Sequence, residues 1–565
     1  MGFGQFTMKP GASVPWASRI LALLLASGPG YVGCTVGTQP ASRPERVIQW
    51  QRWEHGLTAQ KDHPHPYTAV EVDVRFTGPG GATFQVPAFW DGDRGIRFRA
   101  AFPSSGVWRW RTSCLDPTDA GLHGRSGEVH VNAYTGENPL YRHGDLRVSV
   151  DQRHLVHADG TPFLWMGDTG WNAAWKSTPP EWQEYVDTRA RQRFSVLQTV
   201  ATGTAARNST TNPASGHAPF HGDGTPNPPF WRDLEEKLAY ANDRGLVVLL
   251  TGVGNSPAGF GEKQRPPAFA RFLAGRLAGH MVVFSPSMDQ RFDLQNDESG
   301  TRLRALTTHL ITQHPGTHFD TIKQYHDKAY ADFCGLQTGH QGGNLNRAYD
   351  AARAWTLELW RRPPVKPVIN LEAMYDAHGH DNALNWRAQD VRKLGWITWL
   401  SGSRGYTYGA GDVPPKVPAG AGGVWRFNTD VAAYDHWRQA LVWPSAAQMT
   451  HLRDFFASIE WWRLEPAPEL VKNQAGEAPR KMAASRSPTG DLLVAYLPDN
   501  AEIVLDLTTA PAVLVGRWFN PVTGSSVAQS GPIAPGPAVT LRRPAGWADA
   551  VLLLTRSNPS PVSPK

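Results

Sequence analysis

The chain has 565 residues, a formal net charge of +6 and only three Cys. Its Lys and Arg residues are scattered, whereas a nucleic-acid-binding face gathers its cations, so the composition argues against a nucleic-acid partner. The spacing of Cys34, Cys114 and Cys334 fits neither a disulfide framework nor a metal site, and we expect Cys114 and Cys334 to be buried free thiols. The 23 Trp residues are expected mainly in the core, although indoles also stack on sugar rings.

The first 34 residues have the pattern of an export signal. Lys9 and Arg19 precede a short apolar run, Ile20–Ala26, which ends near Cys34. The segment resembles a bacterial lipoprotein signal, in which Cys34 is lipidated, but Tyr31 stands where Leu is usual, so an ordinary cleaved signal is the alternative. We therefore expect export to the periplasm or cell surface, with a lipid on Cys34 as the one contact with a membrane.

After a linker over 35–44, residues 45–148 have the pattern of an all-β domain. Apolar residues from Val70 to Phe76 alternate with charged ones, and the same period of two recurs from Ile96 to Ala100. Turn sequences rich in Gly separate the strands at short intervals. This spacing and the domain length are typical of a β-sandwich.

From residue 149 to residue 465 the sequence alternates between strand and helix patterns. Helices are predicted over Pro179–Arg193 and Phe230–Arg244. Eight such repeats predict a (β/α)8 TIM-type barrel. The eight expected strands are Phe163–Met166, Ser195–Val200, Leu246–Leu250, His280–Phe284, Phe319–Ile322, Phe333–Leu336, Val368–Leu371 and Gly405–Tyr408.

Strand patterns return over 466–556, in runs such as Leu492–Tyr496 and Val551–Leu554, and predict a small C-terminal β-sandwich. The tail over 557–565, rich in Pro and Ser, is expected to be disordered. The predicted fold class is α/β plus all-β: a central barrel flanked by two β-sandwich domains.

Three carboxylates follow predicted barrel strands: Asp168 after the first, Asp289 after the fourth and Glu372 after the seventh. In this fold the chemistry lies at the carboxyl ends of the strands. Glycosidases need two carboxyl groups on either side of one bond, and strands four and seven face each other across the barrel mouth. The simpler alternatives are that Asp168 caps the following helix and that Glu372 caps a helix or pairs with an Arg.

The sequence resembles the apiosidase-like glycoside hydrolases. The motifs that carry the resemblance lie at 165–171, 197–200, 337–340, 367–372, 405–409, 424–425 and 444–455. The order of domains over about 45–555 is also similar, and it ends in a small sandwich that this family names as a collagen-binding module. The resemblance implies a glycoside hydrolase on a TIM-type barrel, without a cofactor.

Carried over to this sequence, the resemblance implies Glu372 as the nucleophile and Asp289 as the acid/base. The family usually has Gly-Gly-Asp after strand four, whereas this chain has Ser285-Pro-Ser-Met-Asp289, so Asp293 and Asp297 stay open as alternatives. The implied substrate-binding residues are Asp168, Trp171, Gln198, Gln337, His340, Tyr375, Trp399, Tyr408 and Trp425, with Tyr325 and His326 as weaker candidates.

The leading hypothesis is an exported glycoside hydrolase with a retaining mechanism, whose partner is a carbohydrate. A carbohydrate-binding or adhesin-like protein on the same scaffold is the alternative, because the loop after strand four departs from the family pattern. A metal-dependent hydrolase is disfavoured because no His-Glu-x-x-His spacing occurs among the 20 His. The identity of the sugar and the oligomeric state do not follow from the sequence.

Overall fold

The computed structural model describes residues 47–202, 213–254, 267–339, 341, 344–377, 386–411, 424 and 436–556. All of them belong to one compact unit, Arg46–Lys565. The predicted signal segment with Cys34, the tail over 557–565, and the predicted site residues His340 and Trp425 lie outside the described residues. None of the described helices is long and apolar enough to cross a membrane.

Two sheets form the N-terminal part and share one apolar core, which includes Trp53, Phe76, Phe98 and Trp108. The predicted alternation over Val70–Phe76 is confirmed, because Val72, Val74 and Phe76 are buried. One sheet has the order β1-β8-β7-β3-β4 and the other the order β2-β6-β5. The strands are β1 (Val47–Ile48), β2 (Arg52–Thr58), β3 (Val72–Thr77), β4 (Thr83–Pro87), β5 (Phe89–Trp90), β6 (Gly95–Ala101), β7 (Gly106–Cys114) and β8 (Ser126–Asn132), with one short helix, α1 (Pro66–Ala69).

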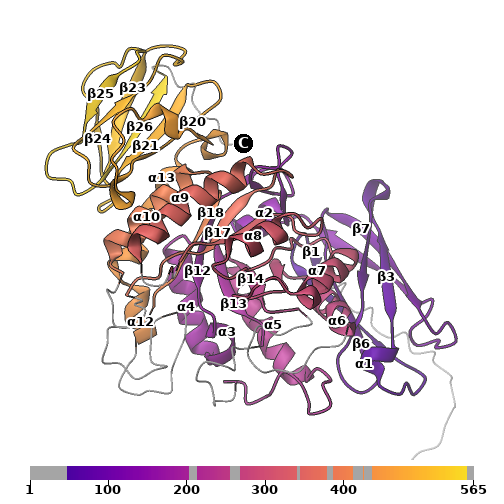
Figure 1. The fold of residues 1–565 in the computed structure, drawn as a ribbon. Helices are drawn as coiled ribbons and strands as arrows, with labels where there is room; N and C mark the ends of the chain where they lie inside the picture. Colours follow the sequence, from indigo (N-terminus) through magenta and orange to yellow (C-terminus); the bar gives the residue numbers. More distant parts are fainter. Residues whose placement is uncertain are drawn as a thin grey trace, which may run out of the picture. The chain divides into compact units, whose positions relative to one another are not determined.

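The centre of the molecule is a parallel sheet of seven strands in the order β15-β14-β13-β12-β18-β17-β16, curved as a half-barrel. Helices follow the strands along the chain, as Figure 1 shows. The strands are β12 (Trp165–Thr169), β13 (Val196–Val200), β14 (Val247–Thr251), β15 (Val282–Ser285), β16 (Cys334–Gln337), β17 (Val368–Glu372) and β18 (Gly405–Tyr408). The helices are α3 (Ala173–Lys176), α4 (Pro179–Arg191), α5 (Pro228–Asp243), α6 (Ala268–Arg276), α7 (Leu294–Leu306), α8 (Phe319–His326), α9 (Leu345–Arg361), α10 (Ala388–Leu400), α12 (His436–Leu441) and α13 (Pro444–Ala457).

Before this sheet, α2 (Pro139–His143) and a small antiparallel sheet of β9 (Leu146–Val148), β10 (Leu155–His157) and β11 (Pro162–Phe163) pack against its inner core. Phe163 belongs to this small sheet, so the first parallel strand begins at Trp165 and not at Phe163 as expected. The other strands start and end within three residues of their predicted positions, apart from the fifth.

The predicted fifth strand, Phe319–Ile322, is wrong. These residues begin helix α8, whose buried face carries Ile322, Tyr325 and His326 at helical spacing. The place between β15 and β16 is taken by an irregular segment over 309–314. The amide N–H of Phe284 in β15 donates to Leu310 O, and that of Asp332, before β16, donates to Ile311 O. This segment therefore links the two edges of the parallel sheet.

The two faces of the sheet are both apolar, as is usual when helices cover a parallel sheet. On the inner face, Trp165, Val196, Leu249 and Ile369 belong to one cluster. On the outer face, residues such as Met166, Leu197 and Val248 pack with the helices in another. Inner and outer residues alternate along each strand, because successive side chains of a strand point to opposite faces.

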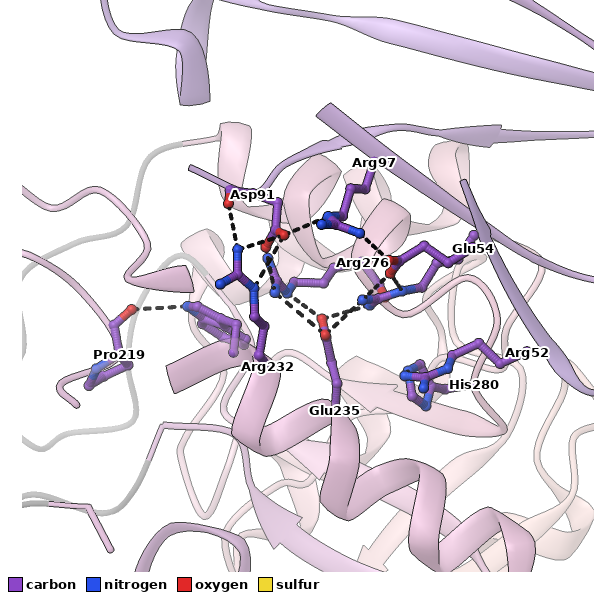
Figure 2. Close-up of polar contacts among 11 residues, drawn as sticks. Arg52, Glu54, Asp91, Arg97, Pro219, Arg232, Glu235, Arg276 and His280 are labelled. Carbon is purple, nitrogen blue, oxygen red and sulfur yellow. Dashed lines mark hydrogen bonds and ion pairs between the residues drawn. The ribbon is translucent and has the colours of Figure 1, made fainter. Parts of the chain in front are cut away.

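A buried ionic cluster joins the N-terminal sheets to helices α5 and α6 (Figure 2). Arg99 of β6 contacts Glu54 of β2 at 2.6 Å and Glu235 of α5 at 2.7 Å. Arg276 of α6 contacts Glu235 and, at 3.0 Å, Asp91. The outer face of β6, which the sequence pattern makes polar, is thus covered by the barrel helices at Arg99, whose side chain is only 5% exposed. We call Glu54, Asp91, Arg97, Arg99, Arg232, Glu235 and Arg276 the junction cluster.

The C-terminal part has a six-stranded sheet in the order β19-β20-β21-β26-β23-β24 and the separate pair β22-β25, with one shared apolar core. The strands are β19 (Glu465–Pro466), β20 (Ala483–Arg486), β21 (Leu492–Leu497), β22 (Glu502–Leu505), β23 (Leu514–Phe519), β24 (Ser526–Ala528), β25 (Val539–Arg542) and β26 (Ala550–Arg556).

This C-terminal sheet packs on α10 and α13. The indole of Trp396 in α10 stacks on Tyr496 of β21 with ring centroids 5.9 Å apart, and it contacts Phe455 of α13 edge-on. Beside it, the buried Arg392 pairs with Asp549 at 2.9 Å.

Cys114 and Cys334 are buried free thiols, which confirms the expectation for them.

Candidate active site

Glu372, the last residue of β17, lies on the inner side of the sheet. It is 4% exposed, and its Oε2 atom lies 3.3 Å from Nε2 of His314. His314 belongs to the segment that links β15 and β16. A carboxylate at the carboxyl end of a parallel strand is therefore brought against an imidazole from the opposite edge of the sheet.

A β-bulge turns Glu372 toward this side. Leu336 pairs with Asn370 and Gln337 pairs with Glu372, so Leu371 has no partner in β16. The side chains of Ile369 and Leu371 both lie in the inner cluster, and simple alternation would send Glu372 outward. The extra residue resets the alternation, which is how bulges re-aim side chains near active sites.

Three contacts hold the bulge. Gln198 Nε2 donates to Leu371 O at 3.0 Å. Gly335 lies close to Leu371. A Cβ atom on Gly335 would stand 2.7 Å from Leu371 Cδ1 and 2.2 Å from Gln313 O, so a larger residue at position 335 would displace the backbone. Asn370 reaches Thr338 Oγ1 at 2.7 Å, so this amide braces neighbouring strands.

His314, which the sequence analysis did not single out, is central to this arrangement. Its ring is fully buried and meets the indole of Trp171 edge-on, with centroids 5.1 Å apart and planes at 88°. Its amide N–H donates to Ser285 Oγ at 2.8 Å, which fixes its backbone to the end of β15. The one signal that could have found it is its place near a strand end, which the wrong assignment of the fifth strand concealed.

Asp289 reaches the same imidazole through its backbone. Its amide N–H donates to His314 Nδ1 at 3.3 Å. Its φ is +46°, a left-handed conformation that few residues other than Gly adopt and that is enriched at functional sites. The Asp289 side chain is exposed, in contrast to Glu372. The two candidate catalytic residues thus flank one histidine.

Tyr375 is a second group that both carboxylates influence. Burial raises the pKa of its phenol well above the usual value, and the charges of Glu372 and, less strongly, Asp289 raise that pKa further. Hydrogen bonds from Thr169 and Trp171 act in the opposite direction, and Trp171 Nε1 donates to the phenol oxygen at 3.1 Å. Trp171 therefore contacts both Tyr375 and His314.

Gln198 and Gln337 lie beside Glu372. Gln337 pairs with it across β16 and β17, and Gln198 contacts Leu371. Each has a buried side-chain oxygen without a hydrogen-bond partner among the described residues. Such oxygens can accept hydrogen bonds from sugar hydroxyls, which would satisfy buried polar atoms that are costly to leave alone.

Three predicted substrate-binding residues have other surroundings. Asp168 is fully buried on the outer side of β12, where it pairs with Arg189 at 2.8 Å and accepts from Tyr185 at 2.8 Å. Tyr408 is buried with its hydroxyl 2.8 Å from Ser445, and Trp399 of α10 stacks on a phenylalanine of α13. The structure corrects their expected role, because these side chains connect strands to helices and face away from Glu372.

The alternative acids also have structural partners. Asp293 caps α7, with Oδ1 accepting from the amide N–H of Gln295 at 2.7 Å. Asp297 contacts Lys328 at 2.7 Å. Tyr325 accepts from the Asp293 amide, and His326 bonds a backbone carbonyl. Among the described residues, no group of three or more His, Cys, Asp or Glu could hold a metal ion.

The sequence of this chain matches the family model "Apiosidase-like, catalytic domain" over residues 149–463. The match covers more than half of the chain, so the protein belongs to the apiosidase-like family and is a glycoside hydrolase. A second model, a domain of unknown function named DUF5060, matches residues 46–115. No curated protein matches the chain.

Solved structures show a similar fold. A structure named "Glycoside hydrolase" has a TM-score of 0.63 and 23% identity, over 75% of this chain and 99% of that one. A glycoside hydrolase family 5 protein from Bacteroides vulgatus ATCC 8482 has the same TM-score and identity, over 75% of this chain and 95% of its own. A third structure, from the same strain, has a TM-score of 0.64 at 16% identity and covers 90% of this chain.

Proposed function

We propose that this chain hydrolyses a glycosidic bond in a polysaccharide or oligosaccharide by a retaining mechanism, with Glu372 as nucleophile and Asp289 as acid/base. The observation that carries the proposal is that two acidic residues flank one imidazole, Glu372 through its carboxylate and Asp289 through its backbone. Glu372 contacts His314 Nε2, and the Asp289 backbone contacts Nδ1 of the same ring. The charges of both carboxylates also raise the pKa of Tyr375.

In the first step, the ionised carboxylate of Glu372 attacks the anomeric carbon and forms a glycosyl ester. The bond from that carbon to the leaving oxygen breaks, and the oxygen takes a proton from the Asp289 carboxyl group. In the second step, Asp289 takes a proton from water, the water oxygen attacks the anomeric carbon, and the ester bond breaks. The two inversions retain the configuration of the sugar.

The same chemistry sets the expected separation of the two carboxyl groups in the substrate complex. Retaining enzymes place them about 5 to 5.5 Å apart and inverting enzymes about 6.5 to 9.5 Å apart, because the latter need room for a water. An NMR spectrum of the product formed first, before the anomers equilibrate, distinguishes the two cases. A product with the configuration of the substrate is the expected result.

Three features of the whole chain belong to the same proposal. We place segment 309–314 as the fifth member of an eight-stranded barrel over 149–465, supported by its hydrogen bonds to both edges of the parallel sheet. We assign the all-β parts to two β-sandwiches over 45–148 and 466–556, supported by their separate cores. We propose export with a mature N-terminus at or near Cys34, which mass spectrometry of the native protein tests. A mature protein that keeps Met1 or Met8 contradicts export.

The roles are tested with two variants and one control. A screen of the purified protein on plant and bacterial polysaccharides first identifies a substrate and a matching activated aryl glycoside. Glu372→Ala is expected to abolish turnover of both, because no glycosyl ester can form. Asp289→Ala is expected to lose polysaccharide activity by about 10²- to 10⁴-fold but to lose less on the aryl glycoside, whose leaving group departs without protonation. Azide is expected to restore part of that smaller loss by replacing the base-activated water of the second step.

Asp293→Ala is the matched control, since this residue lies in the same loop and caps α7. It is expected to lower stability and leave the dependence on the leaving group unchanged. An Asp289→Ala enzyme with full polysaccharide activity overturns the assignment, and Asp293 and Asp297 then become the candidates for the acid.

The alternative function is a carbohydrate-binding protein on this scaffold. The observation in its favour is the exposure of Asp289, since a general acid usually has its pKa raised by burial. Binding of a polysaccharide by both the natural protein and Glu372→Ala, with turnover by neither, would support it.

A further inference from the structure

The imidazole of His314 is placed between the two proposed catalytic residues and contacts each in a different way. Nε2 faces the Glu372 carboxylate at 3.3 Å, and Nδ1 faces the amide nitrogen of Asp289 at 3.3 Å. The ring is 0% exposed, and the indole of Trp171 meets it edge-on. The flanking contacts therefore limit how the ring can rotate.

These contacts determine where the imidazole proton lies. The Asp289 amide can only donate, so Nδ1 must accept and carries no proton. A neutral imidazole then has its proton on Nε2, the nitrogen that lies 3.3 Å from Oε2 of Glu372. A doubly protonated ring would set the Nδ1–H against the amide N–H of Asp289. The titratable residues that contact the ring are Glu372 of β17 and, through its backbone, Asp289 of the loop after β15; Tyr375 is bonded to Trp171, which meets the ring edge-on.

We propose that His314 is the positioning residue that couples the two steps of the reaction, with Nε2 set against the carboxylate of the nucleophile Glu372 and Nδ1 accepting from the backbone of the acid/base Asp289. The inference rests on the proposed function and assigns a new residue to that site. The donor end orients the Glu372 carboxylate toward the anomeric carbon. The acceptor end holds Asp289 in its left-handed conformation, which sets the direction of its side chain.

A link through His314 is useful because Glu372 and Asp289 lie on structurally different parts of the protein. Glu372 stands at the end of a strand and is fixed by a bulge, whereas Asp289 is exposed in a loop. A misplacement of about 1 Å at a reacting group can cost about 10²-fold in rate. A rigid ring between the two residues keeps the position of the loop fixed relative to the end of the strand.

Two isosteric variants separate the two ends of the ring. In His314→Asn the side-chain oxygen replaces Nδ1 and still accepts from Asp289, but the donor to Glu372 is lost. In His314→Gln the side-chain nitrogen replaces Nε2 and still donates to Glu372, but the acceptor for Asp289 is lost. The two variants should therefore fail in different steps.

His314→Asn is expected to lose about 10- to 100-fold in kcat on both polysaccharide and activated aryl glycoside, without rescue by azide. His314→Gln is expected to lose a similar factor on polysaccharide only, and to gain rate with azide on the aryl glycoside. Equal losses in both variants on both substrates, or no loss in either, overturn the proposal. His309→Gln is the matched control, since His309 is buried in the same segment, bonds the Leu277 carbonyl through Nε2 and should keep that bond.

A measurement on the natural protein needs no substrate. In a ¹⁵N-labelled sample, two-bond ¹H–¹⁵N correlations report which ring nitrogen carries the proton, and His314 is assigned by its loss in His314→Gln or by selective labelling. We expect Nε2 to be protonated and Nδ1 unprotonated at neutral pH. A proton on Nδ1 overturns the inference.

The same set of variants distinguishes the failure of this inference from that of the proposed function. If Glu372→Ala retains turnover, the catalytic roles are wrong whatever the His314 variants do. If Glu372→Ala is inactive and both His314 variants match the natural enzyme, only the role of His314 is wrong.

Discussion

The junction cluster and the active site both bury carboxylates, but they surround them with different partners. At the junction, the 3%-exposed side chain of Glu235 lies between two guanidinium groups, those of Arg99 and Arg276. In the site, the 5%-exposed side chain of Glu372 faces the imidazole of His314. Two guanidinium groups fix the position of a carboxylate and occupy its oxygens with charge-assisted hydrogen bonds. The imidazole beside Glu372 holds this carboxylate less strongly than two guanidinium groups would, which suits the nucleophile role that we propose for it.

The difference shows that burial alone does not mark a functional acid in this protein. Glu54, Asp91 and Asp168 are all half-buried or buried, and each is paired with at least one Arg. Such residues link parts of the molecule. The carboxylates that we assign to catalysis are those at strand ends whose neighbours are His314, Trp171 and Tyr375.

The largest effect is expected from neutralising the two buried glutamates in turn. Glu372→Gln should lower kcat on an activated aryl glycoside by at least about 10³-fold, because an amide is a poor nucleophile. Its melting temperature should stay equal to that of the natural protein or rise, since the variant removes a buried charge at a functional position. Steady-state kinetics and calorimetry check both statements. A marked fall in melting temperature would show that Glu372 has a structural role like that of Glu235.

Glu235→Gln should show the reverse pattern. Removing this charge leaves Arg99 and Arg276 buried without their shared partner, which typically costs about 3–5 kcal/mol of unfolding free energy. The folded fraction should keep the kcat of the natural enzyme. Denaturant unfolding measures the loss of unfolding free energy, and steady-state kinetics measures kcat. Glu298→Gln is the control, because Glu298 is a surface residue that pairs with Arg302, four positions further along α7. A loss of kcat without a loss of stability would contradict the comparison.

The junction should also weaken in acid. Burial raises the pKa of Glu54 and of Asp91, but the neighbouring Arg side chains lower both pKa values by more, so each lies below its usual value. A carboxyl group with a lowered pKa in the folded state stabilises the protein above its unfolded pKa, near pH 4, and loses that contribution as the pH falls through the folded pKa. Melting temperatures below about pH 4 should therefore fall more steeply in the natural protein than in Glu54→Gln. Parallel curves would contradict this.

The smallest effect is expected on the outer surface of the N-terminal sheets. Glu71 is exposed, and Asp73 of β3 pairs with Arg271 of α6 at 2.6 Å, far along the chain from Glu372. Glu71→Ala and Asp73→Ala should leave turnover of a small aryl glycoside within a few-fold of the natural value, with a small loss of stability only in the second. A thousandfold loss of activity in either variant would mean that this part of the protein contributes to chemistry.

The amino-acid sequence alone was sufficient for most of the local structure, although it predicted a strand where helix α8 begins. Alternation predicted β3 and β6, the apolar runs predicted seven parallel strands, and the position of Glu372 at a strand end marked the site. These features depend on neighbours within a few residues, because side-chain periodicity reports which face of an element is buried. The same periodicity predicts the direction of the Asp168 side chain. Asp168 is three positions after the inward-facing Trp165 and therefore points outward.

Only the tertiary structure decided the rest, because it depends on contacts between distant segments. By alternation from Ile369 and Leu371, Glu372 would also point outward, and only the bulge against β16 brings it inside. His314 lies in an irregular segment without strand periodicity, so no local pattern reveals that it joins residues 289 and 372. Arg99 has the alternation of a surface residue, and it is buried because helices over 130 positions later cover it with a matching carboxylate, Glu235.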